Sequence, residues 1–78
     1  MKIKVTASKD LTLAIAKSIA ETAAKRASEI RILYRDKVAN AKSLMGVVAL
    51  SFKKGAELML VAEGGDASRA LDGLKTLL

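Results

Sequence analysis

The chain alternates between two hydrophobic periods, one typical of strands and one typical of helices. Apolar and polar residues alternate over 2–7 and again over 29–35, as expected for strands with one buried face. A turn after the second stretch leads into a short returning strand over 38–41, which makes a hairpin. Residues 57–62 are apolar through their middle and predict a fourth strand, covered better than its neighbours.

Two of the helical stretches have ordinary amphipathic patterns. Over 13–26 the apolar positions form a stripe opposite charged residues at i,i+4 spacing, and either Asp10 or Thr12 is an acceptable N-cap. Residues 68–78 carry alanine and leucine at helical spacing, and Asp66 precedes them as a cap.

The third helix is predicted over 44–53 and is unusually apolar. Ser43 precedes it as an N-cap, Lys53 and Lys54 are expected to face its negative end, and Gly55 is expected to provide a left-handed exit. Seven of its first nine residues are apolar, more than one buried face of so short a helix requires. We therefore expect some of them to face outward and to form a docking surface.

The order β-α-β-β-α-β-α predicts an α+β fold. Four short strands with three helices suggest a four-stranded antiparallel sheet with its helices packed on one face, an open-faced β-sandwich. We expect residues 1–78 to form a single domain, with the first and last strands as neighbours in the interior of the sheet.

Composition narrows the chemistry. The chain has no cysteine and no histidine, so thiol catalysis, the usual general base and the commonest metal ligands are absent. No stretch has the roughly 18 apolar residues of a membrane span, and the first residues lack the apolar core of a signal peptide. These features predict a cytoplasmic protein that is not an enzyme, with no metal, no cofactor and no membrane partner.

The net charge of +6 raises the alternative of a small nucleic-acid-binding domain. One tyrosine and one phenylalanine do not supply the stacking pair of an RNA-recognition sheet, and no GxxG clamp is present. The sequence therefore favours protein partners over nucleic acid.

The segment NAKSLMGVVAL over 40–50, with the sequence that follows it, resembles the second half of HPr, the small phosphocarrier of the bacterial sugar phosphotransferase system. That family has Asn-x-Lys-Ser followed by an aliphatic residue, Met and Gly, and its order of elements is the one predicted above. The matching residues are Asn40, Lys42, Ser43, Leu44, Met45 and Gly46.

The first half departs from the family motif Gly-Leu-His-Ala-Arg-Pro-Ala. Leu11 and Ala16 match, but Thr12 occupies the position of the phosphohistidine, Ala14 that of the arginine and Ile15 that of the proline. A threonine hydroxyl without a neighbouring base is a poor nucleophile at neutral pH. The resemblance therefore implies a Crh-like member, which lacks the histidine, keeps the serine and cannot carry phosphohistidine.

In many HPr proteins the serine matching Ser43 is phosphorylated by a regulatory kinase, so the resemblance implies regulation through Ser43. An HPr kinase or a transcriptional regulator is then the expected partner, with Lys42, Leu44, Met45 and Val48 as the partner-binding residues. Each residue also has a purely structural explanation: Thr12 and Ser43 as helix caps, and the apolar side chains as core. A degenerate HPr-like domain used as a protein–protein interaction module is the alternative.

Overall fold

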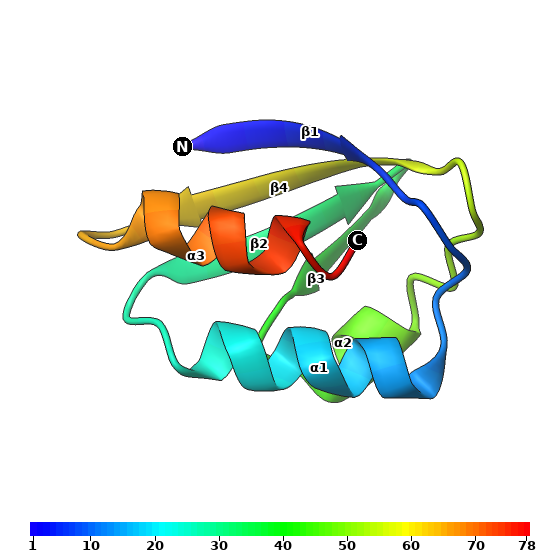
Figure 1. Ribbon diagram of the computed structural model, residues 1–78, viewed down its shortest axis with the longest axis horizontal. Helices are drawn as coiled ribbons and strands as arrows, with labels where there is room; N and C mark the ends of the chain where they lie inside the picture. The colour runs from blue at the N-terminus through cyan, green and yellow to red at the C-terminus, as the bar shows by residue number, and fades with distance from the viewer.

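The computed structural model describes residues 1–78 and contains a four-stranded antiparallel sheet with three helices (Figure 1). This confirms the predicted α+β fold and order of elements. Apart from the helix predicted over 44–53, every element lies within three residues of its expected bounds. None of the helices is long and apolar enough to cross a bilayer. The elements are β1 (Lys2–Thr6), α1 (Leu13–Ala24), β2 (Glu29–Tyr34), β3 (Lys37–Asn40), α2 (Leu44–Val48), β4 (Glu57–Glu63) and α3 (Ala67–Lys75).

The strands lie in the order β1-β4-β2-β3, and every neighbouring pair is antiparallel. The first and last strands are neighbours, as expected, but the expectation that both lie in the interior is wrong, because β1 is an edge strand. β4 pairs with β1 on one side and with β2 on the other, and the β2–β3 hairpin completes the sheet on that side. No strand is left to cover the second edge of β1.

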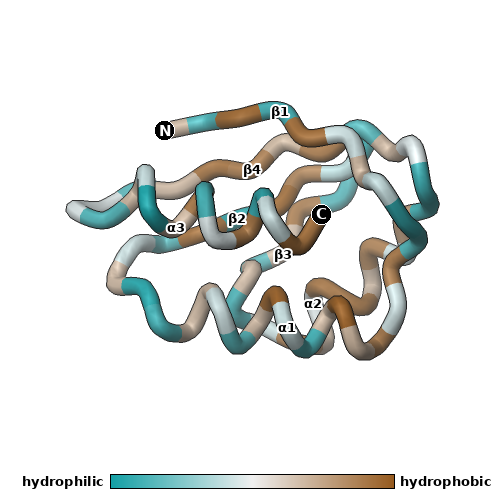
Figure 2. The backbone as a smooth tube through the Cα atoms, viewed as in Figure 1, coloured by the Kyte–Doolittle hydropathy of each residue, from teal (hydrophilic) through white to brown (hydrophobic).

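The core lies between the helices and one face of the sheet. Hydrophobic and hydrophilic positions alternate along α1 and α3, whereas β4 is hydrophobic along most of its length (Figure 2). Alternate residues of β2 and β4 point toward the helices and are fully buried, because successive side chains of a strand face opposite ways. The main buried side chains of these elements are Ile30, Ile32, Leu58, Leu60, Ala16, Ile19, Ala23, Ala70, Leu71 and Leu74.

The expectation that β4 is covered better than its neighbours is confirmed, since neither β1 nor β2 has as many buried residues, but only one of its two faces lies against the helices. Leu58 and Leu60 are buried under the helices, but Met59 and Val61 lie on the other face and are only half-buried. No helix covers that face. The uninterrupted apolar run of β4 therefore does not mark a strand with protein on both sides.

The prediction of a helix over 44–53 is wrong in its length, since α2 ends at Val48. The chain then turns, with Ser51 in the left-handed region at φ 48°. This turn brings Leu50 and Phe52 into the core, where each is 2% exposed. Burying two such side chains stabilises the fold by roughly 1.5–3 kcal/mol each. That gain exceeds the roughly 1–2 kcal/mol cost of a left-handed non-glycine residue, so the helix stops early.

The predicted C-terminal cap of this helix is wrong for the same reason. Lys53 and Lys54 lie beyond the turn, and Gly55, at φ 90°, donates its N–H to the Ala7 carbonyl at 2.8 Å instead of ending a helix. The cation at the end of α2 is Lys37, whose Nζ lies 3.3 Å from the carbonyl oxygen of Ala49.

The carboxylate of Asp66 joins two distant loops. Asp66 precedes α3, as expected, but its side chain does not cap that helix. It accepts hydrogen bonds from the N–H groups of Ala27 and Ser28, at 3.1 and 3.0 Å, and from the Ser28 hydroxyl. The Ser28 hydroxyl and these two N–H groups lower the pKa of Asp66 below its ordinary value of 3.8.

The loop that carries Asp66 fits tightly against Ser28, which is 1% exposed. Gly64 has φ 147°, and a Cβ at this position would lie 2.8 Å from the Cα of Ser28. Only glycine satisfies both the backbone conformation and the close approach. Gly65 has open space around its Cα and no such constraint.

We expect Gly64→Ala to lower the free energy of unfolding by about 1–3 kcal/mol, since the residue would be strained and would push against the backbone of Ser28. Gly65→Ala is the matched control and should stay within about 0.5 kcal/mol of the parent. Urea unfolding of the three proteins measures both effects. Equal stability of the two variants would contradict the tight fit of Gly64.

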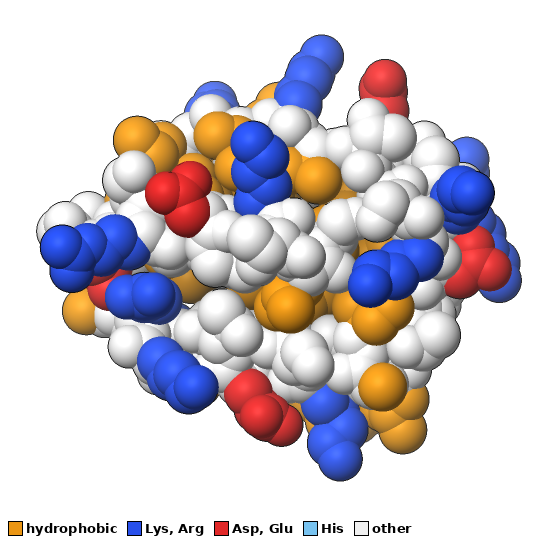
Figure 3. Space-filling view, viewed as in Figure 1, with side chains coloured by type: hydrophobic (Ala, Val, Ile, Leu, Met, Phe, Trp, Pro, Cys, Tyr) orange, Lys and Arg blue, Asp and Glu red, His pale blue; other side chains and the backbone are white.

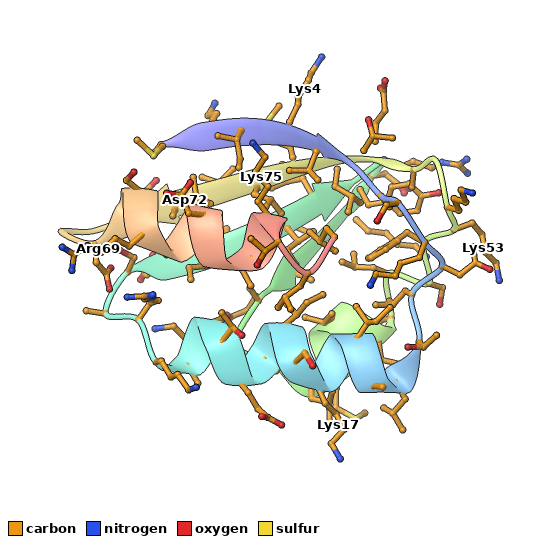
Figure 4. The ribbon with its side chains drawn as sticks, viewed as in Figure 1. Lys4, Lys17, Lys53, Arg69, Asp72 and Lys75 are labelled. Atoms are coloured by element: carbon orange, nitrogen blue, oxygen red, sulfur yellow. The ribbon has the colours of Figure 1, made fainter.

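We expect Asp66→Asn to lower the melting temperature at neutral pH, because an amide cannot accept all three hydrogen bonds as the carboxylate does. The folded-state pKa of Asp66 is depressed, so its contribution is present above the unfolded value of 3.8 and is lost as the pH falls below it. The difference between parent and variant should therefore be full at pH 5–7 and shrink below about pH 3.8. Asp72→Asn on the exposed side of α3 (Figure 4) is the control, and it should show no such pH-dependent difference.

Candidate functional site

Thr12 is the N-cap of α1. Its backbone is extended, with φ −116° and ψ 166°, and its Oγ1 accepts a hydrogen bond from the N–H of Ile15 at 3.2 Å. Of the two caps that the sequence allows, the structure selects Thr12. The hydroxyl is exposed and has no acidic or basic side chain hydrogen-bonded to it. Thr12 therefore begins the helix without being activated as a nucleophile.

The position of Thr12 is fixed by the loop that follows α2. The N–H of Leu11 donates to the carbonyl of Phe52 at 2.9 Å, and the N–H of Lys54 donates to the carboxylate of Asp10 at 2.7 Å. Asp10, the other candidate cap, thus holds the two loops together. Residues far apart in the sequence meet at this end of the molecule, where Figure 4 shows Lys53.

A shallow hollow of about 250 Å³ lies beside Thr12. It brings the start of α1 next to Val48, the last residue of α2. Two of its exposed residues, Leu13 and Ser51, were not among the sequence candidates. Leu13 is 62% exposed although it is a leucine directly after a cap. The apolar pattern of α1 does not distinguish Leu13 from the buried positions of the helix. The only indication in the sequence that Leu13 belongs to the site is its place beside Thr12.

Ala14 is exposed on the first turn of α1 and ends in a methyl group. At this position it offers no donor to an anion, unlike the guanidinium of arginine, which binds phosphate through two parallel N–H groups. The start of α1 therefore has no imidazole that could accept a phosphoryl group. It also has no cationic side chain at position 14 that could bind one.

Ser43 is the N-cap of α2, as the sequence predicts. Its backbone is extended, with φ −98° and ψ 112°, and its Oγ accepts a hydrogen bond from the N–H of Gly46 at 3.2 Å. The side chain is half-buried, so its hydroxyl serves the helix while part of the residue still reaches the surface.

Lys42 is adjacent to Ser43 in sequence, but its ammonium is directed to another part of the molecule. Its Nζ lies 2.8 Å from the carbonyl oxygen of Arg26, just after α1, and its N–H donates to the side chain of Asn40. Lys42 thus ties α2 to the segment that follows α1, and this contact would have to break before the ammonium could reach a group on Ser43.

The apolar residues of α2 divide between the core and the surface. Val47 is fully buried, whereas Leu44, Met45 and Val48 are 37%, 83% and 41% exposed. The structure places the three exposed side chains on one short helix between Ser43 and the hollow beside Thr12. We call Leu13, Leu44, Met45 and Val48 the α2 surface.

The fold is that of a small α+β open-faced sandwich. Its candidate site comprises the start of α1, at Thr12, and the whole of the short helix α2, from Ser43 to Val48. A family model described as the PTS HPr component phosphorylation site matches residues 1–78. The chain therefore belongs to the HPr family.

A relative with a similar sequence supports this assignment. The phosphocarrier protein HPr of Mycoplasma capricolum subsp. capricolum is 39% identical over 57 residues, which is 73% of this chain and 64% of that protein. The matched segment thus spans slightly less than two thirds of the length of this relative.

Solved structures agree over a larger part of the chain. Phosphocarrier protein HPr from Bacillus anthracis superposes with a TM-score of 0.93 at 28% identity, covering 100% of this chain and 95% of that one. A Mycoplasma structure described as the histidine-containing phosphocarrier protein has a TM-score of 0.88 at 33% identity, covering 99% and 90%. Crh of Bacillus subtilis has a TM-score of 0.79 at 30% identity, covering 99% and 88%.

We expect Ser43→Ala to lower the free energy of unfolding by about 0.5–2 kcal/mol, because the N–H of Gly46 loses its acceptor. Ser43→Asp should cost less than about 1 kcal/mol, since aspartate also caps. Ser18→Ala, an exposed serine inside α1, is the matched control and should be neutral or slightly stabilising. Urea unfolding measures all three, and a Ser43→Ala variant as stable as the control would show that the cap contributes nothing.

Proposed function

We propose that this chain is a Crh-like member of the HPr family, one that regulates protein partners through Ser43 and does not relay phosphohistidine. The single observation that carries the proposal is the role of Thr12. It stands at the family's histidine position and acts as the N-cap of α1, with no activating base beside it.

The surroundings of Thr12 support the loss of phosphoryl transfer. The chain contains no histidine at any position. Ala14, at the family's arginine position, leaves the start of α1 without the guanidinium that would neutralise a phosphoryl group. A threonine in this setting can cap a helix, but it lacks the means to accept phosphate from a phosphohistidine donor.

The geometry of Ser43 supports a regulatory role. Its residue is partly exposed, and its hydroxyl lies at a helix start, where an added phosphate of about −1.5 to −2 charge is tolerated. The phosphate would stand beside Leu44 and Met45. It would therefore weaken partners that need an apolar contact there and favour partners that offer arginine to the anion.

The α2 surface supports binding of protein partners. Leu13, Leu44, Met45 and Val48 present apolar side chains that the fold does not bury. Such side chains form the desolvated centre on which small interfaces depend. In this role the chain works as a single HPr-like domain, 1–78, that is cytoplasmic, needs no cofactor and catalyses no reaction of its own. An HPr kinase and a transcriptional regulator are the partners that this surface would serve.

Intact mass after two separate incubations tests the proposal. With phosphoenolpyruvate and enzyme I of the phosphotransferase system the chain should gain no phosphoryl group, and a Thr12→His variant should gain one only slowly, because Ala14 is unchanged. With an HPr kinase and ATP the chain should gain one phosphoryl group. Ser43→Ala should abolish that gain, whereas Thr12→Val, which leaves Ser43 intact, should not.

Met45→Glu tests the α2 surface in the same assay. The substitution should lower the kcat/KM of the kinase about tenfold, as expected for a side chain at the centre of an interface. Its melting temperature should match the parent, because Met45 is 83% exposed. Acid-labile phosphorylation of the unmodified chain would refute the proposal. Failure of the kinase to modify Ser43 would leave the second candidate, an interaction module that uses the exposed α2 surface without a phosphorylation switch.

A further inference from the structure

The face of the sheet that no helix covers carries a connected apolar row. The strand registers place Leu33 of β2 between Met59 of β4 and Val38 of β3, all on this face. Directly opposed side chains in antiparallel strands have Cβ atoms about 4.5–5.5 Å apart, so these three side chains are in contact range. Val61 lies two residues along β4 and extends the row. We call this group (Leu33, Val38, Met59 and Val61) the sheet surface.

The sheet surface is accessible. Val38 is 65% exposed, and the other three side chains are half-buried only by their neighbours. A shallow hollow of about 370 Å³ lies over Leu33, Met59 and Val61. This surface is on the opposite side of the sheet from α2, and it therefore is separate from the α2 surface.

Cations border the apolar row: Arg31 of β2 lies opposite Val61 on the same face, and two lysines lie on β1. Lys2 is paired in register with Val61, and Lys4 with Met59, so both lysines stand on the same face as the row. Lys4 points away from the helices (Figure 4). Arg35 lies at the same hollow, in the turn between β2 and β3, and its guanidinium carbon is 5.2 Å from the centre of the Tyr34 ring. The sheet surface therefore has an apolar centre and a basic rim.

Carboxylates lie at both ends of this face. Glu29 and Glu63 are directly opposite one another in register, and Glu57 lies at the other end of β4. Only Glu29 has an ion pair, with Arg31 at 3.5 Å, and this pair is exposed. A uniformly anionic surface, such as a phosphate backbone or an acidic membrane, would meet these carboxylates as well as the lysines.

We propose that the sheet surface is a second docking site, and that it binds an amphipathic protein segment with apolar anchors and acidic side chains. The apolar anchors would pack on Met59, Leu33 and Val61. The carboxylates would pair with Lys2 and Lys4 on the bordering strand. A protein segment with both apolar and acidic side chains fits this face better than a polyanion does, because a polyanion would be repelled by Glu29, Glu57 and Glu63. Figure 3 shows the other side of the molecule, where α3 lies in front of the sheet, and the basic side chains are interspersed with acidic ones there as well.

Amide chemical-shift mapping on the full chain tests this site. The probe is a synthetic amphipathic helix with leucine along one side and glutamate beside it, and the control probe has lysine in place of glutamate. The acidic peptide should shift amides of β1, β2 and β4 while leaving α2 unchanged. The basic peptide should bind at least tenfold more weakly.

Matched charge variants separate a local effect from net charge. The double variant Lys2→Glu/Lys4→Glu should weaken binding of the acidic peptide on the order of tenfold, because two ion pairs become two like-charge contacts. Lys17→Glu/Lys75→Glu makes the same change in net charge on α1 and α3, at exposed positions labelled in Figure 4, and should have little effect. Met59→Thr should also weaken binding, and the unchanged amide spectrum of each variant away from its substitution checks that it folds.

Several results would overturn the proposal. Shifts confined to α2, equal binding of the basic peptide, or equal weakening by the two double variants would each do so. Vesicles of anionic lipid, or a polyuridine RNA, that shift the same amides at lower concentration would assign the surface to a polyanion. A dimer in sedimentation equilibrium that Met59→Thr dissociates would assign the sheet surface to a second copy of the chain. The test uses no kinase and no change at Ser43, so its failure and failure of the proposed function are distinguishable.

Discussion

The candidate surface depends on where α2 ends. If the helix continued through residue 53, Phe52 would lie four residues after Val48 and would share its exposed face. The turn at Ser51 instead places Leu50 and Phe52 in the core. It also presents the Phe52 carbonyl and the Lys54 N–H to the loop that carries Leu11 and Thr12. One backbone reversal therefore both buries Leu50 and Phe52 and positions the start of α1 beside the exposed end of α2.

Local pattern was sufficient for most of the fold. The strands and α1 each bury one face, and one-sided burial produces a periodic pattern of apolar residues that can be recognised in a single sequence. Thr12 and Ser43 were predictable as caps because a cap needs only the three or four residues that follow it. The apolar excess of the segment after Ser43 also indicated correctly that part of it faces outward, although not which residues.

The features that the sequence did not reveal depend on partners far along the chain. Asp66 precedes a helix and is expected to cap it, but its carboxylate binds Ala27 and Ser28, which lie 39 and 38 residues away. Lys37, not Lys53 or Lys54, reaches the end of α2, because the β3 strand runs beside that helix. The apolar run of β4 indicated correctly that this strand is better covered than its neighbours, but not that its alternate residues pack in the core on one side and form an open surface on the other. In each case the deciding contact is tertiary.

The strand order has a consequence for how the chain folds. β1 is the first strand along the chain, yet its only partner is β4, so that Lys2 pairs with Val61. The loop that must close runs over residues 7–56, about two thirds of the chain, and long-range pairings of this kind form late and slow folding down. Until β4 is in place, β1 has no neighbour, and its polar backbone is free to pair with other chains. The β2–β3 hairpin is local and has no such delay. The folding nucleus is therefore expected in the middle of the chain, with the first strand added last as the edge of a sheet that is otherwise complete.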